Sequence, residues 1–183
     1  MKRLFILIVA AMMTVSMMAE GHMKFKGVEI DGTRTQFVSQ LSKKGCEVGV
    51  NYIGVEMIQA DFAGLNMLVC PLTTSQTQAV YAVIASTRYI DDKASSSAQY
   101  NSLKKLMTEK YGEGQYVSIE DGYYANSIGV FERGNASNAI FFVTSNGSII
   151  LYQHKETLGT NVVVEYIDNT NDSLRKEEAS DDI

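Results

Sequence analysis

The chain has 183 residues, with 16 Lys and Arg against 21 Asp and Glu, and a net charge of −5. This length is typical of one domain. The acidic balance argues against binding to the backbone of a nucleic acid. Two Cys and two His are too few for a zinc framework, and the sequence predicts no metal site.

Residues 1–19 have the layout of a secretory signal peptide. Lys2 and Arg3 begin it, residues 4–13 form an unbroken apolar run, and Ala19 supplies a small residue for cleavage. A bilayer span needs about 20 apolar residues, so the run is too short. A buried N-terminal helix is the alternative. We expect cleavage near Ala19 and a soluble mature protein in the periplasm or outside the cell, not spanning the membrane.

The first predicted helix covers residues 33–44. Phe37 and Leu41 share one face at helical spacing, and Thr33 with Gln36 matches a capping box. Each apolar stripe of this kind is interpreted as a face that packs on the core.

A second helix is predicted from about Ser96 to Tyr111. Leu103, Leu106 and Met107 belong to its apolar stripe, and the following glycine ends it.

The remaining sequence predicts strands joined by turns. Asn146-Gly147 between two apolar runs is a strong hairpin signal. Residues 79–87 are apolar on both faces, as in a central strand. Strands are expected within 48–57, with a turn or bulge at Gly54, and at 65–72, 79–87, 117–120, 127–132, 139–144, 149–154 and 162–167.

This order predicts an α+β fold in which two short helices pack on an antiparallel sheet. One domain is expected over residues 20–167. Two half-repeats, 31–93 and 95–167, are an open alternative, because each contains a helix followed by Gly and strands. Residues 168–183 are acidic and lack aromatic residues, so we expect a disordered, solvated tail.

Cys46 and Cys70 both follow the signal segment. The oxidising space outside the cytoplasm permits a disulfide between them. Two buried free thiols are the alternative, and the sequence leaves both open.

The sequence contains no nucleophile elbow, phosphate-binding loop or dinucleotide motif, so it predicts no catalytic residue and no cofactor. His22 is expected to be disordered beside the cleavage site. His154 is then the only imidazole in the folded part, and its strand-end position predicts a solvent-facing side chain. The carboxylate pairs Asp91-Asp92 and Glu120-Asp121 lie in turn contexts.

Tyrosines are frequent in the second half of the chain. If they share one sheet face, they form an amphipathic binding platform. The alternative is that they border the core at strand ends. The predicted patch consists of Tyr116, Tyr123, Tyr124, Tyr152 and Tyr166.

Several motifs together resemble those of small exported proteins of Bacteroides-type bacteria. They are Met23-Lys24-Phe25-Lys26-Gly27-Val28-Glu29-Ile30-Asp31-Gly32, Asp61-Phe62-Ala63-Gly64 and Leu106-x-x-Lys110-Tyr111-Gly112. The resemblance implies a periplasmic or surface location in a Gram-negative cell and transfers no catalytic residue. Cys46 stands where that group leads us to expect an aromatic residue.

The expected architecture also resembles the beta-lactamase-inhibitor-protein fold, which implies nothing about function. Asp172-Ser173-Leu174 is similar to the three-residue O-glycosylation signal of such bacteria, which implies a sugar on Ser173.

These observations favour an exported, non-catalytic binding or interaction module, with another envelope protein as its partner. The alternatives are a small-ligand carrier with an apolar cavity between helices and sheet, and a hydrolase that uses carboxylates or His154.

Overall fold

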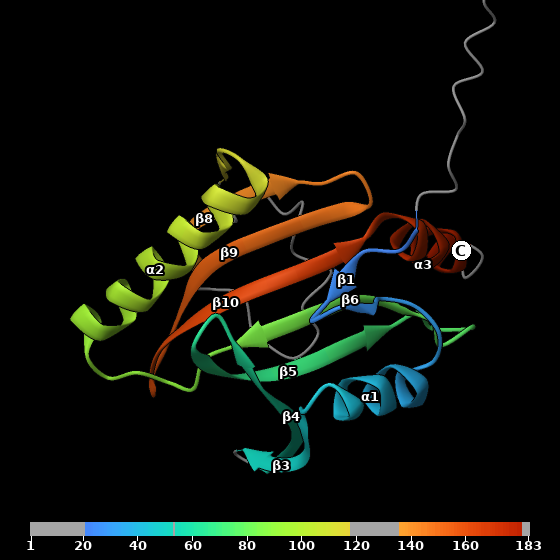
Figure 1. The fold of residues 1–183 in the computed structure, drawn as a ribbon, viewed down its shortest axis with the longest axis horizontal. Coiled ribbons are helices and arrows are strands. Elements are labelled where there is room, and N and C mark those ends of the chain that lie inside the picture. The colour runs from blue at the N-terminus through green and yellow to red at the C-terminus, as the bar shows by residue number, and fades with distance from the viewer. Residues whose placement is uncertain (1–20, 53, 118–135, 181–183) are drawn as a thin grey trace, which may run out of the picture.

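A large antiparallel sheet forms the body of the molecule (Figure 1). The computed structural model describes residues 21–52, 54–117 and 136–180. Within these residues, eight strands form one sheet in the order β3-β4-β5-β6-β10-β9-β8-β7, and β1 pairs with β2. The predicted α+β class is therefore confirmed. The strands are β1 (Lys24–Phe25), β2 (Val28–Glu29), β3 (Glu47–Tyr52), β4 (Val55–Phe62), β5 (Leu65–Thr73), β6 (Val80–Ser86), β7 (Gln115–Val117), β8 (Ala136–Val143), β9 (Gly147–Glu156) and β10 (Gly159–Asp168).

The described part of the chain contains three helices, one more than predicted. They are α1 (Arg34–Lys43), α2 (Lys93–Tyr111) and α3 (Asn169–Ser180). Helix α2 begins one turn earlier than expected, because the carboxylate of Asp92 accepts the backbone N–H groups of Ala94 and Ser95. Asp92 is therefore a helix cap.

The two halves of the sheet have the same arrangement. In the described residues, α1 precedes β3 to β6, and α2 precedes β7 to β10. The last strands of the two halves, β6 and β10, pair antiparallel in the centre of the sheet. Duplication of one helix-plus-strands unit would produce this arrangement, and duplication itself stays a prediction.

Alternation along the strands divides the core between two faces of the sheet. Helices α1 and α2 and the β1–β2 hairpin cover what we call the front face (Figure 1). On β10, Val164 and Tyr166 point to the front, whereas Val163 and Ile167 point to the back. Strand β6 is buried at every position, as the apolar run 79–87 predicted. The sheet therefore carries a hydrophobic cluster on each side.

The predicted disordered tail is wrong for residues 168–180, which are folded. Asp168 ends β10 with 0% of its surface exposed, and Asn171 and Glu178 are buried on α3. The Asn171 amide donates to the carbonyls of Ile30 and Val80. The acidic composition gave no sign of these distant partners, so the domain extends past the predicted boundary at residue 167.

The segment that follows the predicted cleavage site is also part of the fold. His22 lies with its Nδ1 3.1 Å from Oδ1 of Asp168, and the backbone N–H of Met23 donates to Oδ2 of Asp168 at 2.7 Å. The expectation of a disordered His22 is therefore wrong. No helix in the described ranges is long and apolar enough to cross a bilayer. The predicted signal peptide lies outside the described residues.

Candidate functional site

The structure separates the tyrosines that were expected to form one platform. Tyr116 is 68% exposed on β7, whereas Tyr152 and Tyr166 are buried on opposite faces of the sheet. Tyr123 and Tyr124 lie outside the described residues. A shared platform is therefore wrong for the three tyrosines described, because side chains on neighbouring strands share a face only at matching register positions.

His154 is buried, with 2% of its surface exposed, so the prediction of a solvent-facing imidazole is wrong. Strand β9 continues to Glu156, and His154 lies opposite the buried Asn161 of β10. The Glu120-Asp121 pair lies outside the described residues. No group of three or more His, Cys, Asp or Glu side chains in the described part could hold a metal ion.

Cys46 and Cys70 are both buried free thiols. Cys46 packs in the cluster of the front face, whereas Cys70 packs with Met57 and Leu68 in a separate cluster. Burial raises the pKa of both thiols, so both are poor nucleophiles near neutral pH. The structure therefore favours the alternative of two buried thiols. Ser173 is exposed on α3 and donates to the carbonyl of Asn169, and its glycosylation stays a prediction.

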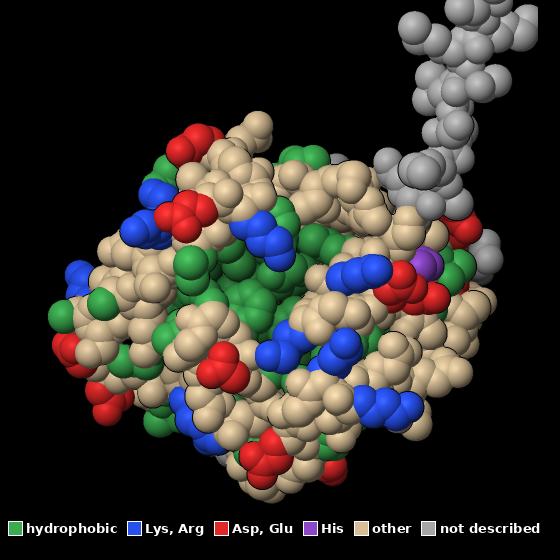
Figure 2. Space-filling view, in the orientation of Figure 1, with side chains coloured by type: hydrophobic (Ala, Val, Ile, Leu, Met, Phe, Trp, Pro, Cys, Tyr) green, Lys and Arg blue, Asp and Glu red, His purple; other side chains and the backbone are tan. Residues whose placement is uncertain are grey.

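A hollow on the front face is a candidate binding site within the part of the chain that the structure describes. Figure 2 shows apolar side chains gathered in this hollow, with basic and acidic side chains around it. Its apolar end has a volume of about 180 Å³ and is lined by Phe62, Ala63, Leu103, Leu106, Met107, Lys110, Tyr111 and Tyr166. Its polar end has a volume of about 260 Å³ and is lined by Leu65, Asn66, Thr87, Arg88, Tyr89, Ile90 and Gln99. The two ends share no lining residue and are two neighbouring hollows, which we call together the front groove.

Helix α2 forms one wall of the front groove. Gln99, Leu103 and Met107 follow one another at intervals of four residues, so they lie in a row along one helix face. Leu106 lies beside this row and is 45% exposed. Leu103 and Met107 are buried in the core, as the sequence predicted for this stripe, whereas Leu106 leaves apolar surface exposed beside them.

The turn between β4 and β5 forms the facing wall. Ala63 and Gly64 both have positive φ, at 54° and 76°, which gives a tight turn. Asp61 accepts the backbone N–H of Gly64 and holds this turn. Phe62, just before the turn, stacks on Phe25 with ring centroids 5.7 Å apart. The Asp61 hydrogen bond and the stacking of Phe62 on Phe25 therefore fix the position of this turn.

Aromatic side chains close the apolar end. Tyr166 rises from β10 in the floor, and its ring meets that of Phe62 edge-on at 6.2 Å. Burial raises the pKa of Tyr166, and the neighbouring Tyr111 hydroxyl raises it further. The Tyr166 phenol therefore stays neutral near pH 7.

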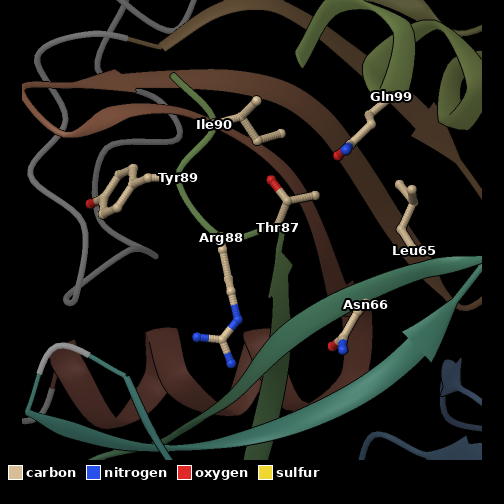
Figure 3. Close-up of a pocket in the computed structure, with 7 residues that line it drawn as sticks. All are labelled: Leu65, Asn66, Thr87, Arg88, Tyr89, Ile90 and Gln99. Carbon is tan, nitrogen blue, oxygen red and sulfur yellow. The ribbon is translucent and has the colours of Figure 1, made fainter. Parts of the chain in front are cut away.

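The polar end contains side chains that can recognise a head group. Figure 3 shows Gln99 reaching from α2 toward Thr87, while Arg88 extends away from α2. The Gln99 Oε1 is buried and has no hydrogen-bond partner in the described part of the chain. Arg88 donates to Oε1 of Gln59 at 3.0 Å, and its guanidinium lies 5.0 Å from the centre of the Tyr52 ring. These two contacts hold the Arg88 guanidinium on the back face of the sheet, because Tyr52 packs with Leu68 there and Gln59 lies opposite Leu68 in the sheet.

Lys110 is in the lining of the apolar end, and the lining of the front groove has no Asp or Glu. The lining also has no His or Cys. The arrangement can hold an amphiphilic ligand, and it offers no nucleophile paired with a base.

Sequence reasoning identified the helix stripe that lines the front groove but assigned it to the core. It gave no role to Arg88, Asn66 or Gln99. No local pattern could have joined them, because they come from three separate elements. No protein-family model, curated protein or solved structure matches the chain.

Proposed function

We propose that this protein is an exported, non-catalytic binding protein that carries a small amphiphilic ligand in the front groove. The observation that carries the proposal is the exposed apolar side chain of Leu106, which is 45% exposed and lines the apolar end. Exposed apolar surface that gathers in a hollow is typical of a ligand site.

The size of the groove favours a small ligand over a protein partner. The two ends have volumes of about 180 and about 260 Å³, each below the roughly 300–1,000 Å³ that is typical of a site for a drug-sized ligand. A stable protein interface buries about 800 Å² on each partner. A ligand of either end would therefore be small.

Binding of the neutral fluorescent probe N-phenyl-1-naphthylamine tests the proposal. The probe should become brighter on addition of the protein, because its rings leave water for an apolar site. Leu106→Asp places a charge in the groove wall and should abolish the increase. Val143→Asp is the matched control, since Val143 is 69% exposed and does not line the groove. Equal binding by both variants would contradict the proposal.

Export is a separate part of the proposal and rests on residues 1–19 alone. Protein recovered from the envelope of its native host should begin at Glu20 when its N-terminus is sequenced. Its intact mass would also show whether Ser173 carries a sugar. A chain that keeps residues 1–19 in the cytoplasm would refute the export proposal.

A further inference from the structure

The loop between β5 and β6 surrounds the side chain of Glu178 with hydrogen-bond donors. Oε1 of Glu178 accepts the backbone N–H of Thr77 at 3.1 Å and the Thr77 hydroxyl at 2.6 Å. Oε2 of Glu178 accepts the backbone N–H of Gln76 at 2.7 Å and the Ser75 hydroxyl at 3.2 Å. Each oxygen therefore receives one backbone donor and one hydroxyl. Successive backbone N–H groups that point at one anion are typical of a carboxylate-binding site.

The β5–β6 loop is held in shape by hydrogen bonds that do not involve Glu178. The backbone N–H of Thr74 donates to the carbonyl of Ala79 at 2.9 Å. Gln78 has a positive φ of 59°, and its side-chain amide donates to the carbonyls of Thr74 and Ser75 at 3.2 and 2.8 Å. The loop itself therefore positions the four donors, and they do not depend on α3 for their arrangement.

The end of α3 docks on the rest of the molecule through polar side chains. The buried residues of α3 are Asn171 and Glu178, and no apolar side chain within residues 169–180 is buried. Asn171 is anchored to Asp168 at the start of the helix, whereas Glu178 lies about two turns further on. A segment that buries little apolar surface opens locally at a lower free energy than the core does. The end of α3 can therefore leave the loop while the sheet stays folded.

We propose that the β5–β6 loop is a binding site for a small carboxylate, and that α3 is a latch that occupies this site through Glu178. An external carboxylate takes the place of the Glu178 side chain, and the end of α3 is then released. The four groups around Glu178 are all donors and are divided between two oxygens, so they select an anion of this shape. None of them lines the front groove, so this site is separate from that of the proposed function.

Removal of the internal carboxylate tests the binding site. Glu178→Ala keeps the four donors, and acetate should bind them at neutral pH. The Tm of this variant should rise with sodium acetate and reach a plateau, when compared with equal concentrations of sodium chloride. Glu177→Ala is the matched control, because Glu177 is the exposed neighbour on α3. Its Tm should respond to acetate no more than that of the wild-type protein.

Loss of one donor should weaken the binding of acetate. In the Glu178→Ala background, Thr77→Val removes the hydroxyl that lies 2.6 Å from the carboxylate. It should raise the acetate concentration of half-maximal effect about tenfold, the size of one charge-assisted hydrogen bond. Ser75→Ala removes the hydroxyl at 3.2 Å from an exposed position and should have a smaller effect. This second variant keeps the comparison available if Thr77→Val does not fold.

Trypsin measures the release of α3. Cleavage after Lys176 requires the end of the helix to open, and it frees a peptide that begins at Glu177, which mass spectrometry follows. Acetate should speed this cleavage in the wild-type protein relative to chloride. Glu178→Ala should be cleaved about tenfold faster than the wild-type protein without acetate.

A Tm of Glu178→Ala that responds equally to acetate and chloride would refute the carboxylate site. An acetate response of the same size in Glu177→Ala would show a general effect of the ion and would also refute it. A wild-type cleavage rate that acetate leaves unchanged would overturn the latch.

Discussion

The front groove and the junction of β10 with α3 use their side chains in opposite ways. At the junction, the buried Asp168 accepts two backbone N–H groups, from Met23 and Asn171. In the groove, the apolar side chain of Leu106 is 45% exposed, and the buried Oε1 of Gln99 has no hydrogen-bond partner in the described part of the chain. The comparison indicates that the junction serves folding, because its polar groups are satisfied within the chain. The groove, in contrast, has apolar surface that a ligand can cover.

The largest expected loss of stability comes from Asp168→Ala. The change leaves two backbone donors without their acceptor and removes the cap that precedes α3. We expect the free energy of unfolding to fall by about 3 kcal/mol, measured by urea denaturation. Asp168→Asn keeps one acceptor oxygen and should lose less. A loss below about 1 kcal/mol in the alanine variant would remove the structural role assigned to the junction.

Acid should loosen α3 through Glu178. Burial alone would raise the pKa of this carboxyl, but hydrogen bonds from Thr77 and Gln76 outweigh it and lower the pKa to about 2. Its ordinary value is 4.5. A carboxyl with a lowered pKa stabilises the fold above its unfolded pKa, and this stability is lost as the pH falls toward the folded pKa.

Thermal unfolding of the wild-type protein and Glu178→Gln checks this sign. The wild-type protein should have the higher Tm at pH 6. The difference should shrink as the pH falls below about 4.5 and be nearly gone close to pH 2. A difference that stays constant over this range would show that the Glu178 charge does not stabilise α3.

A smaller loss is expected at the start of α1. The Thr33 hydroxyl accepts the backbone N–H of Gln36, and the Gln36 side chain accepts the backbone N–H of Thr33. Thr33→Ala should lower the free energy of unfolding by about 1 kcal/mol, measured by urea denaturation. Thr35→Ala serves as the control, because Thr35 is exposed on α1 and is not the capping residue.

The groove variant should have the smallest effect on stability. Leu106 is 45% exposed, so Leu106→Asp should change the free energy of unfolding by less than about 1 kcal/mol while removing probe binding. A large destabilisation would mean that Leu106 serves folding, as the residues of the junction do, and would contradict its assignment to a binding site.

Local signals in the sequence predicted the structural features that depend only on residues close together in the chain. The capping box of Thr33 and Gln36 places the start of α1, and Asn146-Gly147 places the β8–β9 turn. The first helix, the central strand and the antiparallel sheet could therefore be predicted.

Features that depend on distant partners could not be predicted. Helix α3 is held by hydrogen bonds that residues 75–77 donate to the Glu178 carboxylate, although these residues are about a hundred positions away in sequence. The burial of His154 depends on the length of β9 and its register with β10. An apolar helix stripe such as the one that contains Leu106 has the same sequence pattern whether another element covers it or it lines a groove.

The most direct test of the front groove uses the methyl groups of methionine. Met107 lines the groove, whereas Met57 packs with Leu68 and Cys70 in a different cluster. N-phenyl-1-naphthylamine is titrated into protein labelled with ¹³C-methyl methionine, and the methyl resonances are followed by NMR. Binding along α2 predicts a saturable shift of the Met107 resonance with Met57 unchanged. A shift of Met57 alone, or of neither residue, would contradict the account.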